Sequence, residues 1–564
     1  MIYESTFPPA VVPSNESFWQ YLLRHNIGDT PGDKVILQEH ERPDRQFTYA
    51  SAPHMAGLGA LGLCDKLALE RGHTVLIVGG NTLDYLHLEF SVLWLGVTAA
   101  LGNASATTGD LVHMIDTVQP VAVFCDAALM ESVAKAITDA KQARKPRLVG
   151  LGERGIADLA FPGDFVEDPL KEPPPPLDLT RKDNHTVPAL ICFSSGTTSG
   201  APKAAVLSHH NVLAYPLLYR ASDATTAGSN ASDVFYAPLA HIYGVFVAAT
   251  ALYTGGYVRL LRAYSLPVYL AACSEVRATT LRVVPPTLVA MVKLLATQPS
   301  PAVDLSSVTT IVCAGAALAP ETIRGVRAVL GPDVALVQAY GMTEGLATVV
   351  SREAGASRPD KQGSVGQPLS GGRVRIVDDQ GEDVQRGEEG EIVFTSPTVF
   401  MGYRGGDRIE ARNAFLSGET AWLLSGDIGR MDDDGFLWLT DRKKDMIKYK
   451  AHQVSPAELE GLLHAHPLVL EAGVCATWDD NQQTEVPVGY VSLTDAAVTG
   501  KDSREVHTVL DGIRAWVDGQ VAPYKRLRGG LVQLPTMPRN ATGKLLRRNL
   551  PARLAAAEKA KARL

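Results

Sequence analysis

The sequence predicts an α/β protein with a large N-terminal domain of helix-covered sheets and a small α+β C-terminal domain. The chain has 564 residues, which exceeds one ordinary hydrophobic core and indicates roughly two to four domains or lobes. From about residue 70, short apolar runs alternate with helix-like segments. After Asp441 the pattern changes to short strands mixed with helices.

The alternation identifies several strand-and-helix units. Short apolar runs flanked by amphipathic segments are typical of strands that lie in a sheet covered by helices, and we expect such a sheet to be parallel. The predicted units are Thr74 to Val78 with Leu83 to Leu95, Val121 to Cys125 with Ala127 to Ala143, and Thr310 to Cys313 with a helix from Pro320 to Gly331 and a second strand at Val334 to Gln338.

Two features divide the chain. Pro173 to Pro176 cannot lie inside a sheet and reads as a surface connector before the apolar strand Ala189 to Phe193. In the C-terminal part, Ser455-Pro456 opens a helix, with Glu458 in capping-box position. We place the boundary at Asp441-Arg442, which gives domains of residues 1–440 and 441–564.

Composition excludes several classes of protein. The formal net charge is −8, from 53 basic and 61 acidic residues, so a broad nucleic-acid interface is not expected. No apolar run approaches the ~20 residues of a transmembrane helix, and the N-terminus lacks a secretory signal, so we expect a soluble protein. The six cysteines form no CxxC pair and are expected to be buried free thiols in a reducing compartment.

The chain ends in Ala562-Arg563-Leu564, which has the small-basic-leucine form of a peroxisomal address. A peroxisomal import receptor is therefore a predicted partner, with a cytoplasmic location as the alternative. The same ending is also compatible with a frayed terminal helix.

The loop from Ser194 to Lys203, with the sequence SSGTTSGAPK, follows an apolar strand. It offers hydroxyl groups, free backbone N–H groups and one lysine, a composition suited to a polyphosphate. It is not a Walker A loop, because no Gly-Lys-Ser/Thr closes it. By contrast, Gly57 to Gly62 matches the dinucleotide fingerprint but precedes a strand instead of following one, so we interpret it as helix packing.

Several motifs then occur in a defined order: SSGTTSGAPK, Gln338 to Glu344 (QAYGMTE), Ser425-Gly426-Asp427, Asp441-Arg442, and Pro538 to Lys544. In this order they resemble the adenylate-forming enzymes, and the chain is most similar to acyl-CoA synthetases of the 4-coumarate-CoA ligase-like branch. The resemblance covers nearly the whole chain. It implies ATP, Mg²⁺ and coenzyme A as ligands and a C-terminal domain that is mobile about a hinge at 441–442.

The resemblance implies a role for each motif. Thr343 lies near the α-phosphate, Glu344 holds magnesium, and Asp427 accepts hydrogen bonds from the ribose hydroxyls. Arg442 contacts ribose or phosphate, and Lys544 bridges the carboxylate of the acid and the α-phosphate. The nucleotide-binding set is completed by Ser195, Gly196, Thr197, Thr198, Ser199, Gly200, Lys203, Gln338, Tyr340 and Gly341.

Further residues are assigned by the same resemblance. His241 gates the acyl pocket, which Tyr243, Gly315 and Gly341 line. Lys448 and Gln453 serve the conformation in which a thiol attacks the acyl-adenylate. No HExxH motif or Cys/His cluster suggests another metal site.

This chain departs from its relatives at two points. The phosphate loop has one residue more than the usual SGTTGxPK form. Which of Thr197, Thr198 and Ser199 contacts which phosphate therefore stays open. Ala451 replaces a common glycine beside the incoming thiol.

The implied activity is an AMP-forming acid–thiol ligase acting on an aryl, hydroxycinnamate-like acid or a medium-chain fatty acid. The alternatives are transfer of the acyl group to a carrier protein, an oxidative, luciferase-like use of the acyl-adenylate, and a scaffold without activity. The last is disfavoured by the presence of Glu344, Asp427, Arg442 and Lys544.

Overall fold

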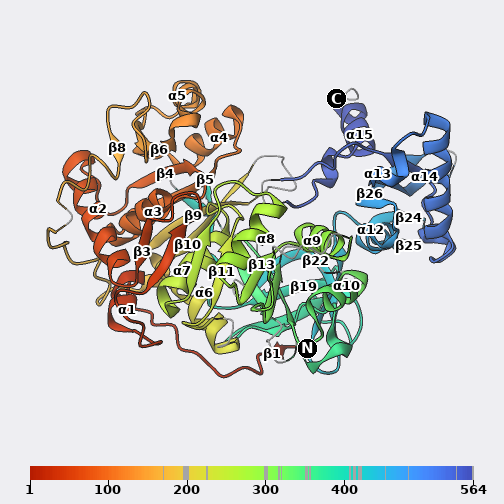
Figure 1. Ribbon diagram of the computed structural model, residues 1–564, viewed down its shortest axis with the longest axis horizontal. Helices are drawn as coiled ribbons and strands as arrows, with labels where there is room; N and C mark the ends of the chain where they lie inside the picture. The colour runs from red at the N-terminus through yellow and green to blue at the C-terminus, as the bar shows by residue number, and fades with distance from the viewer. Residues whose placement is uncertain are drawn as a thin grey trace.

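The structure is a computed structural model (Figure 1). It describes residues 1–168, 170–194, 202–223, 227–297, 303–314, 318, 320–349, 354, 357–405, 408–410, 415–416, 422–450, 452–480, 482–540 and 543–561. Figure 1 shows a large domain, coloured from red to cyan, beside a small blue domain formed by the C-terminal part of the chain. The predicted fold class is therefore confirmed.

The largest sheet of the described residues takes all but two of its strands from the N-terminal half of the chain. The order of its strands is β21 (Arg408–Glu410), β20 (Gly402–Gly405), β10 (Lys203–Ser208), β9 (Pro188–Ser194), β5 (Thr98–Asn103), β4 (Thr74–Gly79), β6 (Ala122–Asp126), β7 (Arg147–Leu151) and β8 (Ala160–Phe161). In this order, the neighbours from β9 to the last strand, β8, pair in parallel. The first four strands pair with one another in antiparallel fashion.

Three further sheets complete the large domain. One has the order β13 (Thr280–Val283), β14 (Thr310–Ala314), β15 (Ala335–Met342), β16 (Gly345–Val349) and β17 (Gln367–Pro368). A second has the order β11 (Ser232–Phe235), β12 (Tyr257–Leu260), β2 (Val35–Glu39) and β3 (Gln46–Thr48). The third has the order β1 (Tyr3–Glu4), β18 (Arg373–Val377), β19 (Gly390–Thr395), β22 (Leu423–Met431) and β23 (Leu437–Arg442).

Helices pack against these sheets (Figure 1). They are α1 (Phe18–Arg24), α2 (Ser51–Leu67), α3 (Leu83–Leu95), α4 (Thr108–Val118), α5 (Met130–Asp139), α6 (His209–Ser222), α7 (Ile242–Thr254), α8 (Leu266–Glu275), α9 (Pro285–Thr297) and α10 (Pro320–Leu330).

The prediction of a parallel sheet is only partly right. Parallel pairing holds where a helix connects successive strands, as in β14, α10 and β15. It fails where a short loop joins neighbours, because a tight turn reverses the chain and makes the strands antiparallel. The turn after Met342 lies at such a reversal, and the strands on either side of the loop after Ser194 are also antiparallel.

The glycine-rich stretch Gly57 to Gly62 lies inside α2, as predicted. A Cβ atom on Gly59 would lie 2.2 Å from Ser91 Oγ of α3, and one on Gly62 would lie 2.0 Å from the backbone oxygen of Phe165. These glycines therefore permit close packing of α2, in agreement with their interpretation as helix packing.

The small domain has its own core, formed by residues between Ile447 and Leu531. Its helices are α12 (Pro456–Ala465), α13 (Asp495–Val498), α14 (Ser503–Asp518) and α15 (Pro551–Lys561), and its strands are β24 (Ile447–Tyr449), β25 (His452–Val454), β26 (Val469–Asp479), β27 (Thr484–Leu493) and β28 (Leu531–Gln533).

Only half of the predicted capping box forms at α12. The Ser455 hydroxyl accepts a hydrogen bond from the backbone N–H of Glu458, as expected. The Glu458 carboxylate, however, pairs with Lys525 at 2.6 Å instead of returning to the N-cap. A tertiary ion pair has taken the place of the local contact.

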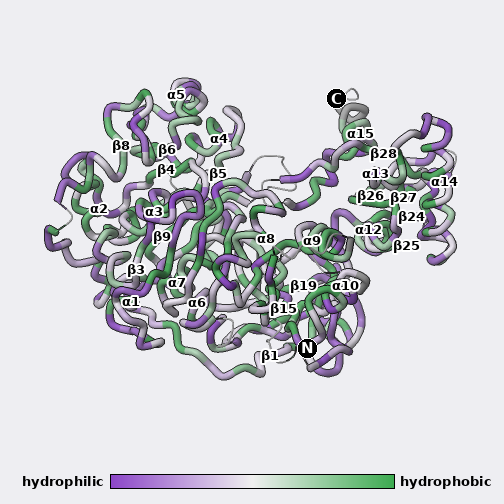
Figure 2. Tube along the Cα trace, viewed as in Figure 1, coloured by the Kyte–Doolittle hydropathy of each residue, from purple (hydrophilic) through white to green (hydrophobic). Residues whose placement is uncertain are grey.

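Hydropathy follows this arrangement (Figure 2). Apolar residues concentrate in the central strands and polar residues in the outer loops and helices, which is the distribution of a folded core. All six cysteines are free, and of these only Cys64 is not fully buried. Among the described residues, we find no helix both long and apolar enough to cross a membrane.

Candidate active site

The predicted phosphate loop joins two antiparallel strands. Ser194 at the end of β9 pairs with Lys203 at the start of β10. The Lys203 ammonium lies 4.9 Å from the centre of the Tyr403 ring, so the closing lysine is held over an aromatic face. The intervening predicted residues, Ser195, Gly196, Thr197, Thr198, Ser199 and Gly200, lie outside the described residues.

The predicted magnesium residue lies at the tip of the β15–β16 hairpin. Thr343 and Glu344 form its turn and are each 7% exposed. Glu344 Oε1 accepts a 2.6 Å hydrogen bond from the Tyr403 hydroxyl. Tyr403 therefore links Lys203 and Glu344. Sequence analysis missed this tyrosine, because only the pairing of β20 with β10 brings it here.

The predicted ribose-binding aspartate is part of a buried network. Asp427 on β22 accepts a 2.8 Å hydrogen bond from the Tyr340 hydroxyl on β15. It also lies 3.3 Å from Arg442 Nε, directly across from it in the β22–β23 pair. The structure thus brings together Tyr340, Asp427 and Arg442, which are far apart in the sequence.

Gly341 lies beside this network and cannot carry a side chain without rearrangement. A Cβ atom there would be 2.8 Å from the backbone oxygen of Gly345 in the adjacent strand. The other predicted pocket glycine, Gly315, lies outside the described residues.

His241 caps the N-terminus of α7. Its Nδ1 accepts a 3.2 Å hydrogen bond from the backbone N–H of Tyr243. Burial, together with the positive charge of Lys544, lowers the pKa of His241 to about 4. The ring is therefore neutral near pH 7, and because Nδ1 is an acceptor, Nε2 carries the proton.

Lys544 projects from the small domain into this region. Its backbone N–H donates to Asn540 Oδ1 at 2.8 Å. Removal from bulk water between the domains, and repulsion from Arg442, lower its pKa to about 8, while Asp427 acts in the opposite direction. The residue nevertheless keeps accessible surface. The predicted catalytic lysine is thus close to Asp427, Arg442 and His241.

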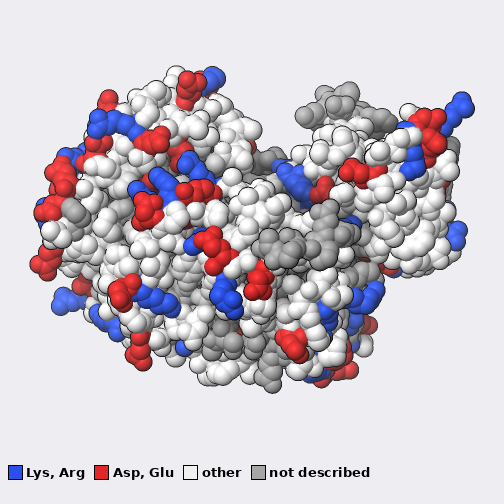
Figure 3. All heavy atoms as spheres, viewed as in Figure 1, with Lys and Arg blue, Asp and Glu red and all other residues white. Residues whose placement is uncertain are grey.

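A second lysine, which sequence analysis missed, contributes to the same positive field. The pKa of Lys444 is lowered to about 8, chiefly by burial and by the charges of Arg442 and Arg548, while Asp445 opposes the shift. Figure 3 shows a notch between the two domains with Lys and Arg side chains at its base. A cluster of cations whose burial and mutual repulsion lower their pKa values is typical of a site that binds a polyanion.

The predicted hinge residue anchors the small domain. Asp441 accepts hydrogen bonds from the Ser455 hydroxyl at 2.7 Å and from the backbone N–H of Ala457 at 2.8 Å. Across the domains, Lys293 of α9 donates to the backbone oxygen of Val469 at 2.6 Å. These contacts hold the observed orientation, in which Lys544 faces the large domain.

Lys448 and Gln453 are not brought to this site. They pair with each other across the β24–β25 hairpin and are both exposed. Figure 1 shows this hairpin on the side of the small domain that faces away from the large one.

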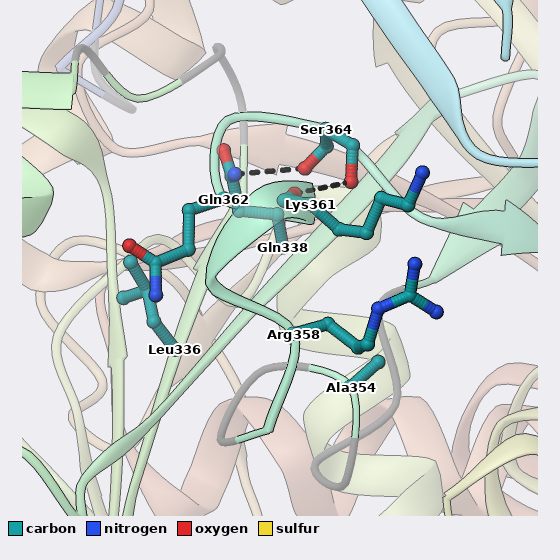
Figure 4. A pocket seen from close by; sticks show the side chains of 7 residues that line it. All are labelled: Leu336, Gln338, Ala354, Arg358, Lys361, Gln362 and Ser364. Atoms are coloured by element: carbon teal, nitrogen blue, oxygen red, sulfur yellow. Dashed lines mark hydrogen bonds between the residues drawn. The ribbon is translucent and has the colours of Figure 1, made fainter.

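Gln338 lines a separate small pocket (Figure 4). Its amide donates to the backbone oxygen of Ser364 at 2.8 Å and accepts from the N–H of Leu318 at 3.1 Å. The cations of this pocket are paired: Arg358 with Asp434 and Asp360, Lys361 with Asp432 and Asp434. This pocket is therefore a structural feature, and nucleotide binding by Gln338 stays a prediction.

The fold and the cluster of cations beside Asp427 are those of a protein that would bind an anionic ligand between a large and a small domain. Two family models match the chain, the AMP-binding enzyme over residues 23–404 and the AMP-binding enzyme C-terminal domain over residues 458–544. The chain belongs to the AMP-binding, adenylate-forming enzyme family.

Curated relatives agree with this assignment. Peroxisomal OPC-8:0-CoA ligase 1 of Arabidopsis thaliana is 31% identical over 490 residues, covering 86% of this chain and 84% of the relative. 4-Coumarate–CoA ligase 2 of Solanum tuberosum is 28% identical over 578 residues, covering 99% and 97%.

Solved structures share the fold. A benzoate CoA ligase from Burkholderia xenovorans LB400 has a TM-score of 0.77 at 24% identity, covering 95% of this chain and 99% of that one. The anthranilate CoA ligase AuaEII, in complex with anthranoyl-AMP, has a TM-score of 0.79 at 24% identity, covering 97% and 99%.

The residues present fit the magnesium ion that the family implies. Mg²⁺ is usually held by one or two carboxylates together with substrate phosphates. Glu344 offers a nearly buried carboxylate with one oxygen oriented by Tyr403. Glu344 would hold the ion, which would neutralise phosphate charge when bound.

The lowered pKa of Lys544 predicts the pH dependence of the first reaction step. If the protonated amine is needed, kcat/KM for pyrophosphate release should decline tenfold per pH unit above about pH 8, since this parameter reports the free enzyme. Pyrophosphate release measured from pH 6 to 10 checks this.

Two variants separate the contributions to that decline. Lys544→Arg should remove the alkaline decline, because an arginine stays protonated throughout this range. Lys444→Met should leave the decline in place. A decline that persists unchanged in Lys544→Arg would contradict the assignment to Lys544.

Proposed function

We propose that the chain is an ATP-dependent carboxylate–CoA ligase. The acid attacks the α-phosphate of ATP to form an acyl-adenylate and pyrophosphate, and the thiol of CoA then displaces AMP to form a thioester. The observation that carries the proposal is the position of Lys544. This lysine of the small domain lies near Asp427 and His241 of the large domain and near Arg442 at the domain boundary.

The surrounding residues support the first step. Lys544 would screen the repulsion between the carboxylate and the α-phosphate and align the two groups. Asp427, which is positioned by the hydrogen bond from Tyr340, would accept hydrogen bonds from the ribose hydroxyls. Arg442 and Lys203 would offset the negative charge of the phosphates. Thr343 lies beside Glu344 at the same turn. Neutral His241 would offer its Nε2–H to the acid without adding charge.

For the second step, the small domain would rotate about Asp441-Arg442 and withdraw Lys544. The exposed hairpin with Lys448 and Gln453 would then face the large domain. Transfer to the phosphopantetheine arm of a carrier protein is the second candidate. It is favoured by Ala451, which replaces the usual glycine beside the thiol and lies outside the described residues.

The acid is proposed as an aryl or medium-chain acid. Relatives named as 4-coumarate–CoA ligases and as an OPC-8:0-CoA ligase support both classes. Ala562-Arg563-Leu564 lies outside the described residues, and peroxisomal import through it stays a proposal.

A panel of acids tests the proposed function. Pyrophosphate release with ATP and Mg²⁺ reports the first step, and AMP release on addition of CoA or of a carrier protein reports the second. AMP release with free CoA supports the ligase. AMP release only with the carrier protein supports the second candidate, and no acid-dependent pyrophosphate release would contradict both.

Lys448→Ala is expected to leave acid-dependent pyrophosphate exchange unchanged, because the residue lies away from the adenylation site. Thioester formation should fall about tenfold, the loss of one contact worth roughly 1.4 kcal/mol in the second conformation. Single-turnover measurement of each step checks this. Unchanged thioester formation would refute the role of Lys448, and a matched exchange at the exposed Lys501 should change neither step.

A further inference from the structure

Arg547 follows Lys544 closely in the chain and is the centre of an ion-pair network inside the small domain. Its side chain is 18% exposed. Nη2 lies 2.6 Å and Nε lies 2.9 Å from the two carboxylate oxygens of Glu460 on α12. In this two-pronged geometry a guanidinium binds a carboxylate strongly and also fixes its direction.

The same guanidinium reaches the segment around the proposed hinge. Arg547 Nη1 lies 3.3 Å from Asp445 Oδ2 and 3.7 Å from Asp441 Oδ1. The other carboxylate oxygen of Asp441 binds the start of α12. Glu460 in turn accepts a 2.8 Å hydrogen bond from the backbone N–H of Val474 on β26. One arginine thus joins the hinge segment, α12 and the sheet of the small domain.

The backbone that carries Lys544 ends at this anchor. The N–H of Asn540 donates to the carbonyl oxygen of Lys544 at 2.9 Å, and the N–H of Leu546 donates to that of Pro538 at 2.8 Å. Arg547 follows Leu546 directly, so its ion pairs fix the end of this paired segment. The position of the Lys544 amine relative to the large domain therefore depends on the anchor.

Stability alone is a weak reason for this network. Burying ions often costs as much free energy as their attraction returns, and apolar side chains of similar size often serve as well. The network does lie within electrostatic reach of the active site. Burial and the charge of Arg442 are the main causes that lower the pKa of Lys544, and the charge of Arg547 adds to them.

We propose that Arg547 is a positioning residue for the first reaction step. It holds the segment that carries Lys544 against the hinge segment, so that the amine lies beside Asp427 and Arg442. The inference rests on the proposed function, in which Lys544 aligns the acid and the α-phosphate. Arg547 acts through Lys544 and not on the substrates themselves. Such alignment is sensitive to small displacements of the aligning group.

Arg547→Met tests the inference, because methionine fills part of the same space without the guanidinium. The kcat for acid-dependent pyrophosphate release should fall about 30-fold or more, since misplacing a catalytic group by ~1 Å can cost ~100-fold. The KM for ATP should change less than about threefold, because the nucleotide-binding residues of the large domain stay in place. Thioester formation from supplied acyl-adenylate should stay close to the wild-type rate, whereas a merely structural role would lower both half-reactions together.

A double variant shows whether Arg547 acts through Lys544. If it does, Lys544→Ala combined with Arg547→Met should release pyrophosphate no more slowly than Lys544→Ala alone, because residues that act as a unit are not additive. Arg514→Met is the matched control. Arg514 Nε lies 3.7 Å from Asp518 Oδ2 on α14, and loss of this pair should change neither half-reaction.

A second single variant covers the case in which Arg547→Met does not fold, since it removes the cation that faces Glu460. Arg547→Lys keeps the positive charge but lacks the planar fork that binds both carboxylate oxygens. A severalfold loss of pyrophosphate release is expected, with thioester formation close to wild type.

The outcomes are distinguishable. Wild-type pyrophosphate release in the folded variants would overturn the inference, and so would an equal loss of both half-reactions or a multiplied loss in the double variant. In each of these cases the ligase function is intact. If the wild-type chain itself shows no acid-dependent pyrophosphate release with a broad panel of acids, the proposed function fails.

Discussion

Replacing Lys544 by alanine is expected to reduce acid-dependent pyrophosphate release by about 1000-fold, the range found for loss of one preorganised electrostatic group. Lys544 is the only ammonium group of the small domain's 538–544 loop, and its charge lies beside Asp427 and Arg442. Without it, the carboxylate and the α-phosphate repel each other unscreened. Initial rates of pyrophosphate release with saturating ATP measure the effect.

The same variant should form thioester from supplied acyl-adenylate at close to the wild-type rate, because only the first step needs this lysine. An equal loss of both steps would contradict the role. Lys525→Ala provides a control for mutation of a lysine in the small domain. It removes the ion pair with Glu458 and should affect stability more than either half-reaction.

Replacing Glu344 by glutamine is expected to lower pyrophosphate release about 100-fold and to raise the Mg²⁺ concentration needed for half-maximal rate. The amide keeps the size of the side chain and can still accept from Tyr403, but it lacks the charge that attracts the ion. Rates measured across a Mg²⁺ titration check both effects.

Tyr403→Phe is the matched control, because it retains the Glu344 carboxylate and removes only its hydrogen-bond donor. A severalfold loss of rate is expected, with the Mg²⁺ requirement raised less than in Glu344→Gln. If Glu344→Gln shows the wild-type Mg²⁺ dependence, the carboxylate does not hold the ion.

Local sequence patterns predicted several of the elements. Thr74, Leu83 and Leu95 were predicted as bounds of a strand and a helix, and β4 and α3 begin and end at or within one residue of them. Such bounds are readable because apolar periodicity and caps act over a few residues. The helix predicted from Ala127 to Ala143 was too long, since a 3₁₀ turn precedes α5 and the helix ends at Asp139.

The sequence by itself also determined the class of enzyme, through motifs whose order resembles a known family, and this assignment is confirmed. The roles of individual residues, including those in the loop after Ser194, stay predictions. The order of the motifs can be read along the chain, and it does not depend on which residues lie between them.

Only the tertiary structure decided which groups share the site. Tyr403 meets Glu344, and Tyr340 meets Asp427, through contacts between segments that are distant in the chain. Whether Asp233 would find Arg282 was equally unreadable, since nothing local to either residue specifies the other. Long-range contacts depend on the packing of the whole domain, and so do burial and the pKa values that follow from it.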